Sequence, residues 1–318
     1  MEILITGVAG FIGSNLADHL LEKGFHVTGI DNFDPFYSRS IKENNIRKAL
    51  ENPNFSFFQA DITVAGSLDN VPFKGGVVVH LAAKTGVRPS IADPAGYIQT
   101  NITGTQHILE WMRKRNLKKM VFASSSSVYG NNQKIPFSES DNVDNPISPY
   151  AFTKKACELM NYTYHHLHEF DIINLRFFTV YGERQRPDLA IHKFTRAISQ
   201  GKEIEMFGQG DTSRDYTYIK DIIAGIDSSI NLLEKDEKVY EIINLGNSQP
   251  IKLSGLVEII GHAMGVKPQI RHLPKQPGDV EITYADITKA TSLLSYRPAT
   301  PLNTGIEKFV AWFKAFGN

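Results

Sequence analysis

Residues 2–31, EILITGVAGFIGSNLADHLLEKGFHVTGID, decide the fold. An apolar run ends at Thr6, and glycines follow at positions 7, 10 and 13. A helical pattern of apolar residues then extends to Gly24, and a second apolar run ends at Asp31. A strand, a glycine turn, a helix, a strand and an acid in this order are typical of a dinucleotide-binding unit.

The same stretch predicts how the cofactor binds. Gly7, Gly10 and Gly13 let the backbone approach a pyrophosphate, and free N–H groups at the start of a helix favour anions. Asp31 follows Gly13 by 18 residues, a suitable distance for accepting hydrogen bonds from the adenosine ribose. A carboxylate at this position repels a 2′-phosphate, so the sequence favours NAD over NADP. A glycine-rich turn that binds no ligand is the alternative.

Apolar runs and helical patterns continue to alternate along the chain. Strands are expected at 55–60, 77–81, 120–123 and 172–178, with helices at 40–50, 97–116 and around Tyr150. This alternation predicts an α/β fold with a doubly wound parallel (Rossmann) sheet. Ligands of such sheets bind beyond the carboxyl ends of the strands. The candidate residues at these ends are Gly7, Asp31, Asp61, Ala82, Ser125 and Phe178.

The pattern changes after Gly182, where charged and glycine-rich loops separate shorter elements. We expect residues 1–180, together with about 217–247, to form the NAD-binding Rossmann domain. Residues 181–216 and 248–318 are then expected to form a smaller C-terminal lobe that binds the substrate. Arginine pairs bidentately with phosphate oxygens, so three arginines are candidates for contacts with a diphosphate. For each of them an ordinary surface charge is an equally good interpretation. The arginines in question are Arg88, Arg186 and Arg214.

Tyr150 and Lys154 are the candidate catalytic pair. They lie at i and i+4 of an expected helix, so both side chains leave it on one face. An ammonium and a cofactor cation near a phenol favour its ionised form, and lowering its pKa from about 10 to about 7 requires roughly 4 kcal/mol. The resulting phenolate suits proton removal from a sugar hydroxyl. An ordinary amphipathic helix is the alternative, because Tyr-x-x-x-Lys is common by chance.

Composition argues against several other classes of protein. The 318 residues carry 34 Lys+Arg and 34 Asp+Glu, so no charge excess indicates a nucleic-acid or membrane partner. A single cysteine, Cys157, fits a reducing compartment, and we expect a cytoplasmic protein without signal peptide or membrane span. No metal site is predicted, because the histidines that crowd one helix lack i, i+4 spacing and a Cys or carboxylate framework. These are His165, His166 and His168.

Taken together, the motifs resemble the extended short-chain dehydrogenase/reductase family over essentially the whole chain. The resemblance rests on residues 6–13, 31–32, 61–62, 80–83 and 176–178, together with Ser125, Tyr150 and Lys154. Within this family the chain is most similar to the nucleotide-sugar C4-epimerases, and among these to the UDP-glucuronate 4-epimerases. The segments that suggest the subgroup are 86–88, 123–130, 176–182 and 184–188.

The resemblance implies roles for individual residues, with Ser125, Tyr150 and Lys154 as the catalytic triad. It implies that NAD contacts Gly7, Gly10, Phe11, Ile12, Gly13, Asp31, Asn32, Asp61, Ile62, Leu81, Ala82, Ala83, Asn101, Tyr150, Lys154 and Phe177. It implies that the UDP-sugar contacts Arg88, Ser125, Ser126, Ser127, Thr179, Arg186, Phe207, Arg214 and Asp279.

Departures from related families indicate the reaction. The 4,6-dehydratases place Asp-Glu where this chain has Ser126-Ser127, and the UDP-glucuronate decarboxylases place Glu at Ser127. UDP-galactose epimerases typically carry Asn at the position of Thr179. The resemblance therefore implies epimerisation of UDP-glucuronate to UDP-galacturonate for polysaccharide biosynthesis, by a homodimer paired through the Tyr97 and Tyr150 helices. Alternatives are a UDP-glucose/UDP-galactose 4-epimerase, a UDP-glucuronate decarboxylase, and a non-catalytic NAD- or nucleotide-sugar-binding protein.

Overall fold

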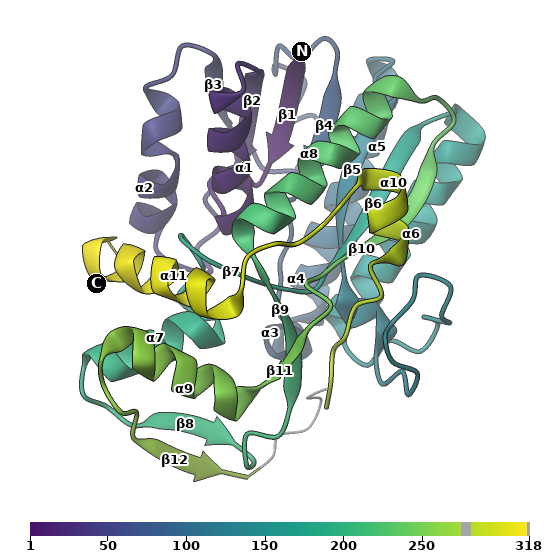
Figure 1. Cartoon of the computed structure of the whole chain (residues 1–318). Helices are drawn as coiled ribbons and strands as arrows, with labels where there is room; N and C mark the ends of the chain where they lie inside the picture. The colour runs from purple at the N-terminus through teal and green to yellow at the C-terminus, as the bar shows by residue number, and fades with distance from the viewer. Residues whose placement is uncertain (275–280, 317–318) are drawn as a thin grey trace.

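The computed structural model describes residues 1–274 and 281–316. Its centre is a seven-stranded sheet with the strand order β10-β6-β5-β4-β1-β2-β3, and every pairing in it is parallel (Figure 1). The predicted doubly wound parallel sheet is confirmed. The strands are β1 (Glu2–Thr6), β2 (His26–Asp31), β3 (Phe55–Gln59), β4 (Val77–His80), β5 (Lys119–Ser125), β6 (Asp171–Phe177) and β10 (Tyr240–Leu245).

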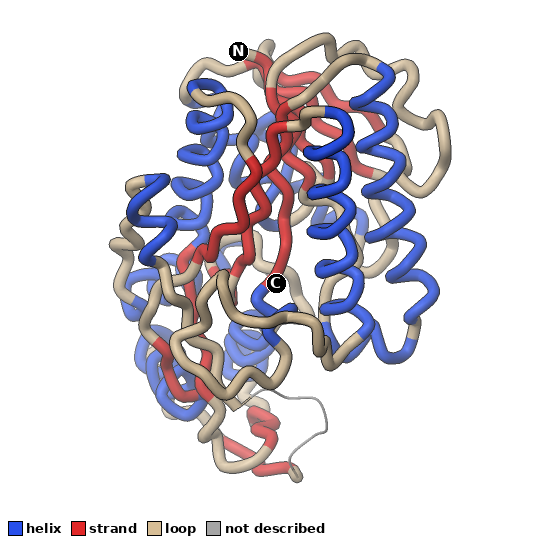
Figure 2. Tube along the Cα trace, turned by 90° about the vertical axis from the view of Figure 1, so that its right-hand side faces the viewer, coloured by secondary structure: helices blue, strands red, loops and turns tan. Residues whose placement is uncertain are grey.

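Helices cover both faces of this sheet (Figure 2). Successive residues of a strand point to opposite faces, so Ile3 and Ile5 join one core cluster while Leu4 joins another. The first cluster contains residues of α1 (Phe11–Glu22), α2 (Arg39–Leu50) and α8 (Ile219–Lys235). The second contains residues of α5 (Gly104–Lys114) and α6 (Pro149–His168). No helix within the described residues is long and apolar enough to span a membrane.

The helix expected over residues 97–116 is present, but it is not α-helical throughout. The structure has α4 (Pro94–Tyr97), a π-helix η1 (Ile98–Thr103) and then α5. Asp93 caps the start of α4 by accepting a hydrogen bond from the Gly96 N–H at 3.0 Å. Within η1, the buried amide of Asn101 bonds to the backbone N–H and C=O of Lys84, at 2.8 and 3.0 Å. The wider turn thus brings a helix side chain to the loop that follows β4.

A smaller lobe lies beyond the carboxyl edge of the main sheet, at the bottom of Figure 1. It contains the two-stranded sheet of β8 (Ile204–Phe207) and β12 (Ile270–Leu273), with α7 (Ala190–Ser199) and α9 (Leu253–Met264). The three-stranded sheet of β7 (Thr179–Tyr181), β9 (Ser213–Tyr218) and β11 (Pro250–Lys252) lies between it and the main sheet. The remaining elements are α3 (Val87–Ala92), the 3-10 helix η2 (Ser126–Tyr129), α10 (Thr288–Leu294) and α11 (Leu302–Phe316).

Asp215, in β9, joins separate segments of the chain. Its side chain is fully buried and accepts backbone N–H groups from Asn247 at 2.7 Å, Ser248 at 2.9 Å and Ala285 at 3.0 Å. Burial raises the pKa of this carboxyl, and the three backbone hydrogen bonds act in the opposite direction. The side chain therefore holds the loop after β10 and the segment before α10 against β9.

We expect Asp215→Ala to lower the free energy of unfolding by about 3–5 kcal/mol, because each buried N–H left without a partner costs ~1–3 kcal/mol. Urea unfolding monitored by circular dichroism measures this change. Asp211→Ala, four residues earlier and exposed, is the matched control and should stay within about 0.5 kcal/mol of the unmodified protein. A loss below about 1 kcal/mol for Asp215→Ala would contradict the assigned role.

Candidate active site

The glycine turn lies where β1 ends and α1 begins. Gly7 has φ +72°, and a Cβ there would lie 2.9 Å from the backbone of Ala82, at the end of β4. A Cβ on Gly13 would lie 2.2 Å from the Gly7 carbonyl oxygen. Gly10 caps α1 without a side-chain hydrogen bond, which leaves the first N–H groups of the helix to an anion. The turn therefore has the features of a pyrophosphate site.

A cavity of about 360 Å³ extends from this turn along the carboxyl edge of the sheet. Its volume lies within the range of small-molecule sites. The cavity collects most of the residues predicted to contact NAD, and from the predicted substrate set it collects Ser125, Thr179 and Arg186. The predicted cofactor residues on its wall are Gly7, Gly10, Phe11, Ile12, Gly13, Asp31, Asn32, Ile62, Leu81, Ala82, Ala83, Tyr150, Lys154 and Phe177.

Asp31 is on the wall of this cavity and is largely buried. Its Oδ2 accepts the Ala9 N–H at 3.0 Å, and its Oδ1 accepts the Phe33 N–H at 2.8 Å. Burial raises the pKa of Asp31, while these two hydrogen bonds lower it. Each carboxylate oxygen has a second lone pair, so the side chain retains acceptor capacity on the cavity side for a ribose hydroxyl.

Two predicted cofactor residues, Asp61 and Asn101, do not line the cavity. Asp61 accepts hydrogen bonds from Asn32 Nδ2 at 3.0 Å and from the Thr63 N–H at 2.8 Å, which lower the pKa of its carboxyl against the effect of partial burial. Asn101 joins Lys84 to Thr153 of α6, with 2.9 Å from its Nδ2 to the Thr153 hydroxyl. Both residues therefore form hydrogen bonds to residues of the segments that line the cavity.

Ser125, Tyr150 and Lys154 line the cavity together, where β5 ends and α6 begins. Ser148 caps α6 through the Ala151 N–H at 3.1 Å, which fixes Tyr150 in the first turn. Tyr150 is hydrogen-bonded to Ser125. The Ser125 hydroxyl donates to Ser127 Oγ at 3.0 Å. Lys154 Nζ donates to the Ala123 carbonyl at 2.6 Å.

Burial and neighbouring groups shift the pKa of Tyr150 in opposite directions. Burial raises the pKa of Tyr150, and the Ser125 hydrogen bond and the charge of Arg186 offset this only in part. Lys154 is not among the groups that lower it; its own pKa falls to about 8, because the ammonium is buried. The expected lowering of the Tyr150 pKa depends on the ammonium together with the cofactor cation and stays a prediction, while burial acts against it.

Only some of the predicted substrate residues line the cavity. Arg186 lines the cavity, pairs with Asp188 through two hydrogen bonds of 3.0 and 2.8 Å, and lies over the Phe36 ring. Arg88 lies 4.9 Å from the centre of the Phe207 ring, so these two predicted residues contact each other across the gap between α3 and β8. The remaining predicted residues Ser126, Ser127 and Arg214 are off the cavity wall, and Asp279 lies outside the described residues.

His80 belongs to the motif of residues 80–83, but the sequence assigned it no role in the site. His80 is fully buried between the hydroxyls of Thr6 at 2.6 Å and Thr105 at 3.0 Å, and burial lowers its pKa to about 3, so it is neutral. Its contacts hold the ends of β1 and β4 against α5. Other residues that line the cavity lie close in sequence to the predicted motifs. This closeness was the only signal in the sequence that could have identified them. These are Asp34, Phe36, Tyr37, Lys42, Lys84, Thr85 and Gly86.

The fold and this site define a nucleotide-sugar epimerase or dehydratase that uses NAD. The profile of the GDP-mannose 4,6-dehydratase family matches residues 4–309, and the chain belongs to this family.

A UDP-glucuronate 4-epimerase from Thermodesulfobacterium geofontis is 42% identical over 98% of this chain and 95% of its own. The structure of UDP-glucuronic acid 4-epimerase from Bacillus cereus in complex with UDP-glucuronic acid and NAD matches with a TM-score of 0.92 and 36% identity, over 99% of both chains. A UDP-glucose 4-epimerase from Thermotoga maritima, with UDP-glucose, matches with a TM-score of 0.89 and 30% identity over 100% of both chains.

The buried Lys154 predicts a specific pH dependence of stability. Its pKa is about 8 in the folded chain against 10.5 for the ordinary side chain, so the unfolded chain binds more protons in this interval. Stability contributed by Lys154 therefore rises with pH across it. Between pH 7.5 and 9.5 the free energy of unfolding should rise by about 2 kcal/mol more in the unmodified protein than in Lys154→Met, as measured by urea unfolding. Parallel pH dependences of the two proteins would contradict the low pKa.

Proposed function

We propose that this protein is an NAD-dependent UDP-sugar 4-epimerase that interconverts UDP-glucuronate and UDP-galacturonate. The observation that carries the proposal is that Tyr150, Ser125 and Lys154 line the same cavity as the glycine turn. The relatives support the choice of reaction and sugar, since the first two matches described above are UDP-glucuronate 4-epimerases. Assay of the purified protein with each UDP-sugar, followed by separation of the products, tests the proposal.

The cavity suits NAD as the resident cofactor. The uncapped start of α1 provides N–H groups for the pyrophosphate, and Asp31 retains acceptors for the adenosine ribose. Ala82 and Ala83 leave room beside the glycine turn. A 2′-phosphate would lie against the Asp31 carboxylate, which favours NAD over NADP. NAD held there would supply the hydride acceptor for C4 of the sugar and the hydride donor for the opposite face of the 4-keto intermediate.

The chain's own residues handle the proton. Tyr150 removes the proton of the C4 hydroxyl, and Ser125, hydrogen-bonded to Tyr150, bridges the phenol and the sugar oxygen. Lys154 holds the nicotinamide ribose, and its ammonium together with the cofactor's positive ring favours the phenolate. The same groups return the proton after the 4-keto sugar has turned about its diphosphate link.

A uronic acid adds a second requirement, because its 4-keto intermediate is a β-keto acid that readily loses CO2. Hydroxyl donors on the carboxylate oppose this loss by holding the carboxylate in place. We assign this role to Ser126, Ser127 and Thr179, of which Thr179 lies on the cavity wall and Ser127 is bonded to Ser125. Arg88, Arg186, Phe207, Arg214 and Asp279 are assigned to the UDP group.

A UDP-glucose/UDP-galactose 4-epimerase is the second candidate, favoured by the match to the Thermotoga maritima enzyme. A neutral hexose has no carboxylate to accept hydrogen bonds from the serine hydroxyls. The preference for one of the two UDP-sugars therefore separates the two functions.

Further assignments follow from the same proposal. Residues 1–180 with about 217–247 bind NAD, and residues 181–216 with 248–318 bind the nucleotide-sugar. The protein is proposed to act in the cytoplasm, in polysaccharide biosynthesis, as a homodimer paired through α6 and the segment that includes Tyr97. The exposed apolar side chains Phe152, Leu159 and Tyr162 on α6 support the pairing.

We expect Tyr150→Phe to lower kcat by about 10²–10⁴-fold, the usual loss when a general base is removed. Binding of UDP should change little, because the lost hydroxyl acts in proton transfer. Initial rates and UDP titration calorimetry measure the two quantities. A variant that keeps more than about a tenth of the unmodified rate would exclude Tyr150 as the base.

The unmodified protein should prefer UDP-glucuronate to UDP-glucose by at least about tenfold in kcat/KM. Hydrogen bonds to a charged acceptor contribute roughly 1.5–3 kcal/mol against about 1 for neutral ones, and ~1.4 kcal/mol is a factor of ten. Thr179→Val should reduce this preference and increase release of UDP-pentose, measured by chromatography of the products. Comparable kcat/KM values for the two sugars in the unmodified protein would favour the second candidate.

A further inference from the structure

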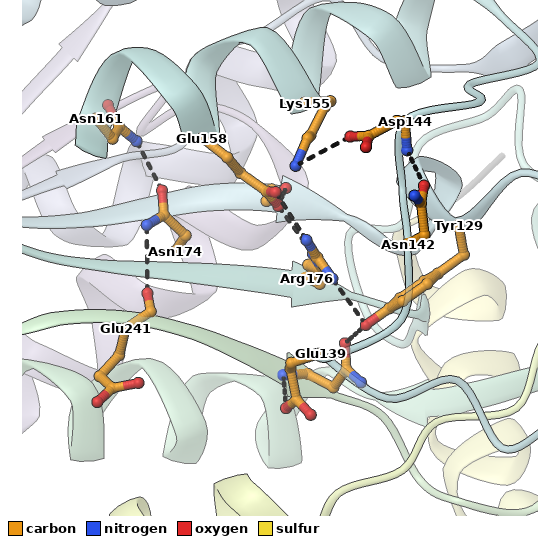
Figure 3. Close-up of polar contacts among 12 residues, drawn as sticks. Tyr129, Glu139, Asn142, Asp144, Lys155, Glu158, Asn161, Asn174, Arg176 and Glu241 are labelled. Atoms are coloured by element: carbon orange, nitrogen blue, oxygen red, sulfur yellow. Dashed lines mark hydrogen bonds and ion pairs between the residues drawn. The ribbon is translucent and has the colours of Figure 1, made fainter. Parts of the chain in front are cut away.

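A fully buried ion pair, Arg176–Glu158, joins β6 to α6 (Figure 3). Arg176 of β6 donates from Nε to Glu158 Oε1 at 2.9 Å and from Nη2 to Oε2 at 2.8 Å. Both side chains are 1% exposed. Neither residue lines the cavity, so the reaction described above makes no direct use of this charged pair.

Both partners also contact the segment that carries Ser125. We call residues 124–129, which end β5 and form η2, the serine turn. Ser124 Oγ donates to Glu158 Oε1 at 2.6 Å, and Arg176 Nη1 donates to the Tyr129 hydroxyl at 3.0 Å. The Tyr129 hydroxyl in turn donates to Asn244 of β10 at 2.7 Å (Figure 3). The ion pair therefore holds the serine turn at its first and last residues.

Glu158 also belongs to the helix that carries the proposed base. Tyr150, Lys154 and Glu158 are spaced four residues apart on α6, so they lie along one side of the helix. The Glu158 carboxylate is thereby one turn beyond Lys154, and its charge raises the Lys154 pKa against the larger lowering by burial. One side of α6 thus carries the base, the ammonium and the anchor of the serine turn.

On the basis of the proposed epimerase function, we propose that Arg176 and Glu158 are positioning residues of the reaction. Their ion pair fixes α6, which carries Tyr150, relative to the serine turn, which carries Ser125. The pair touches neither sugar nor cofactor and acts through the geometry of the Tyr150–Ser125 contact.

Energetics favour a positioning role over a purely stabilising one. Two buried charges lose their hydration, and apolar residues of similar volume often give an equally stable or more stable core. A bidentate Arg–carboxylate pair constrains orientation more strongly than an apolar contact does. In this network both Glu158 oxygens accept hydrogen bonds and all three guanidinium nitrogens of Arg176 donate, which is the condition under which a buried polar network specifies one arrangement.

The chain offers a matched control one turn further along α6. Asn161 Nδ2 donates to Asn174 Oδ1 at 2.7 Å, and both residues are fully buried. This second polar pair joins the same helix to the same strand, β6. Its second hydrogen bond runs from Asn174 Nδ2 to the Glu241 carbonyl at 3.2 Å, so the pair connects to β10 (Figure 3).

The test compares two double variants of the full chain, Glu158→Leu/Arg176→Met and Asn161→Leu/Asn174→Leu. We expect the first to remain folded and to lose about 10–100-fold in kcat with UDP-glucuronate, while KM changes less than about threefold. In a Ser125→Ala background the same pair of substitutions should cost less than about threefold, since the network acts through Ser125. The asparagine control should keep kcat within about twofold of the unmodified protein.

Amide hydrogen exchange of residues 125–130 provides a readout that does not depend on activity. Exchange there should become at least about tenfold faster in Glu158→Leu/Arg176→Met and stay unchanged in the asparagine control. If the ion-pair variant does not fold, Tyr129→Phe replaces it. The ion pair then remains, Tyr129 loses its hydrogen bonds to Arg176 and to Asn244, and kcat should fall about three- to tenfold.

Three results would overturn the positioning role. The first is a folded ion-pair variant whose kcat stays within about twofold of the unmodified protein. The second is a loss of kcat in the asparagine control as large as that in the ion-pair variant. The third is that the ion-pair substitutions lower kcat by the same factor in the Ser125→Ala background as in the unmodified protein. If the unmodified protein epimerises neither UDP-glucuronate nor UDP-glucose, the proposed function fails. The exchange measurement then decides the positioning role by itself, and unchanged exchange in residues 125–130 rejects it.

Discussion

The site depends on the parallel pairing of the central strands. Thr6 pairs with His80 between β1 and β4, and Ser125 pairs with Phe177 between β5 and β6. Because the strands run in one direction, each helix returns the chain so that the next strand also ends at the same edge. The glycine turn, Ala82 and Ser125 meet there for this reason, although they are far apart in sequence.

Local signals in the sequence predicted the elements of the main sheet, because buried parallel strands are short apolar runs separated by helices. They failed for β9, whose sequence Ser-Arg-Asp-Tyr-Thr-Tyr is polar. They also failed for the π-helix, in which Asn101 contacts Lys84, a residue distant in sequence. The glycine turn, Asp31 and the residues after β4 were predicted on the cavity wall. Asp61 and Asn101 do not line this cavity, and their contact with the cofactor stays a prediction.

The protonation of Tyr150 shows a second limit of sequence reasoning. Spacing on α6 predicts that Tyr150 and Lys154 share a face, and they do. Spacing contains no information about burial, which raises the pKa of Tyr150 and lowers that of Lys154 to about 8. The polypeptide therefore contributes the arrangement of these groups, and burial opposes the ionised form of both.

The smaller lobe is assembled from segments that leave the main sheet and come back to it. Between them the chain returns to form α8 and β10, and Asp215 fastens β9 to residues more than thirty and about seventy positions later. Such a lobe cannot be exchanged as a cassette between relatives, since no single pair of cuts releases it. In this chain, replacements in the loops between fixed elements leave these contacts of Asp215 in place, whereas removal of the whole lobe breaks them. Engineering of new sugar specificity faces the same restriction.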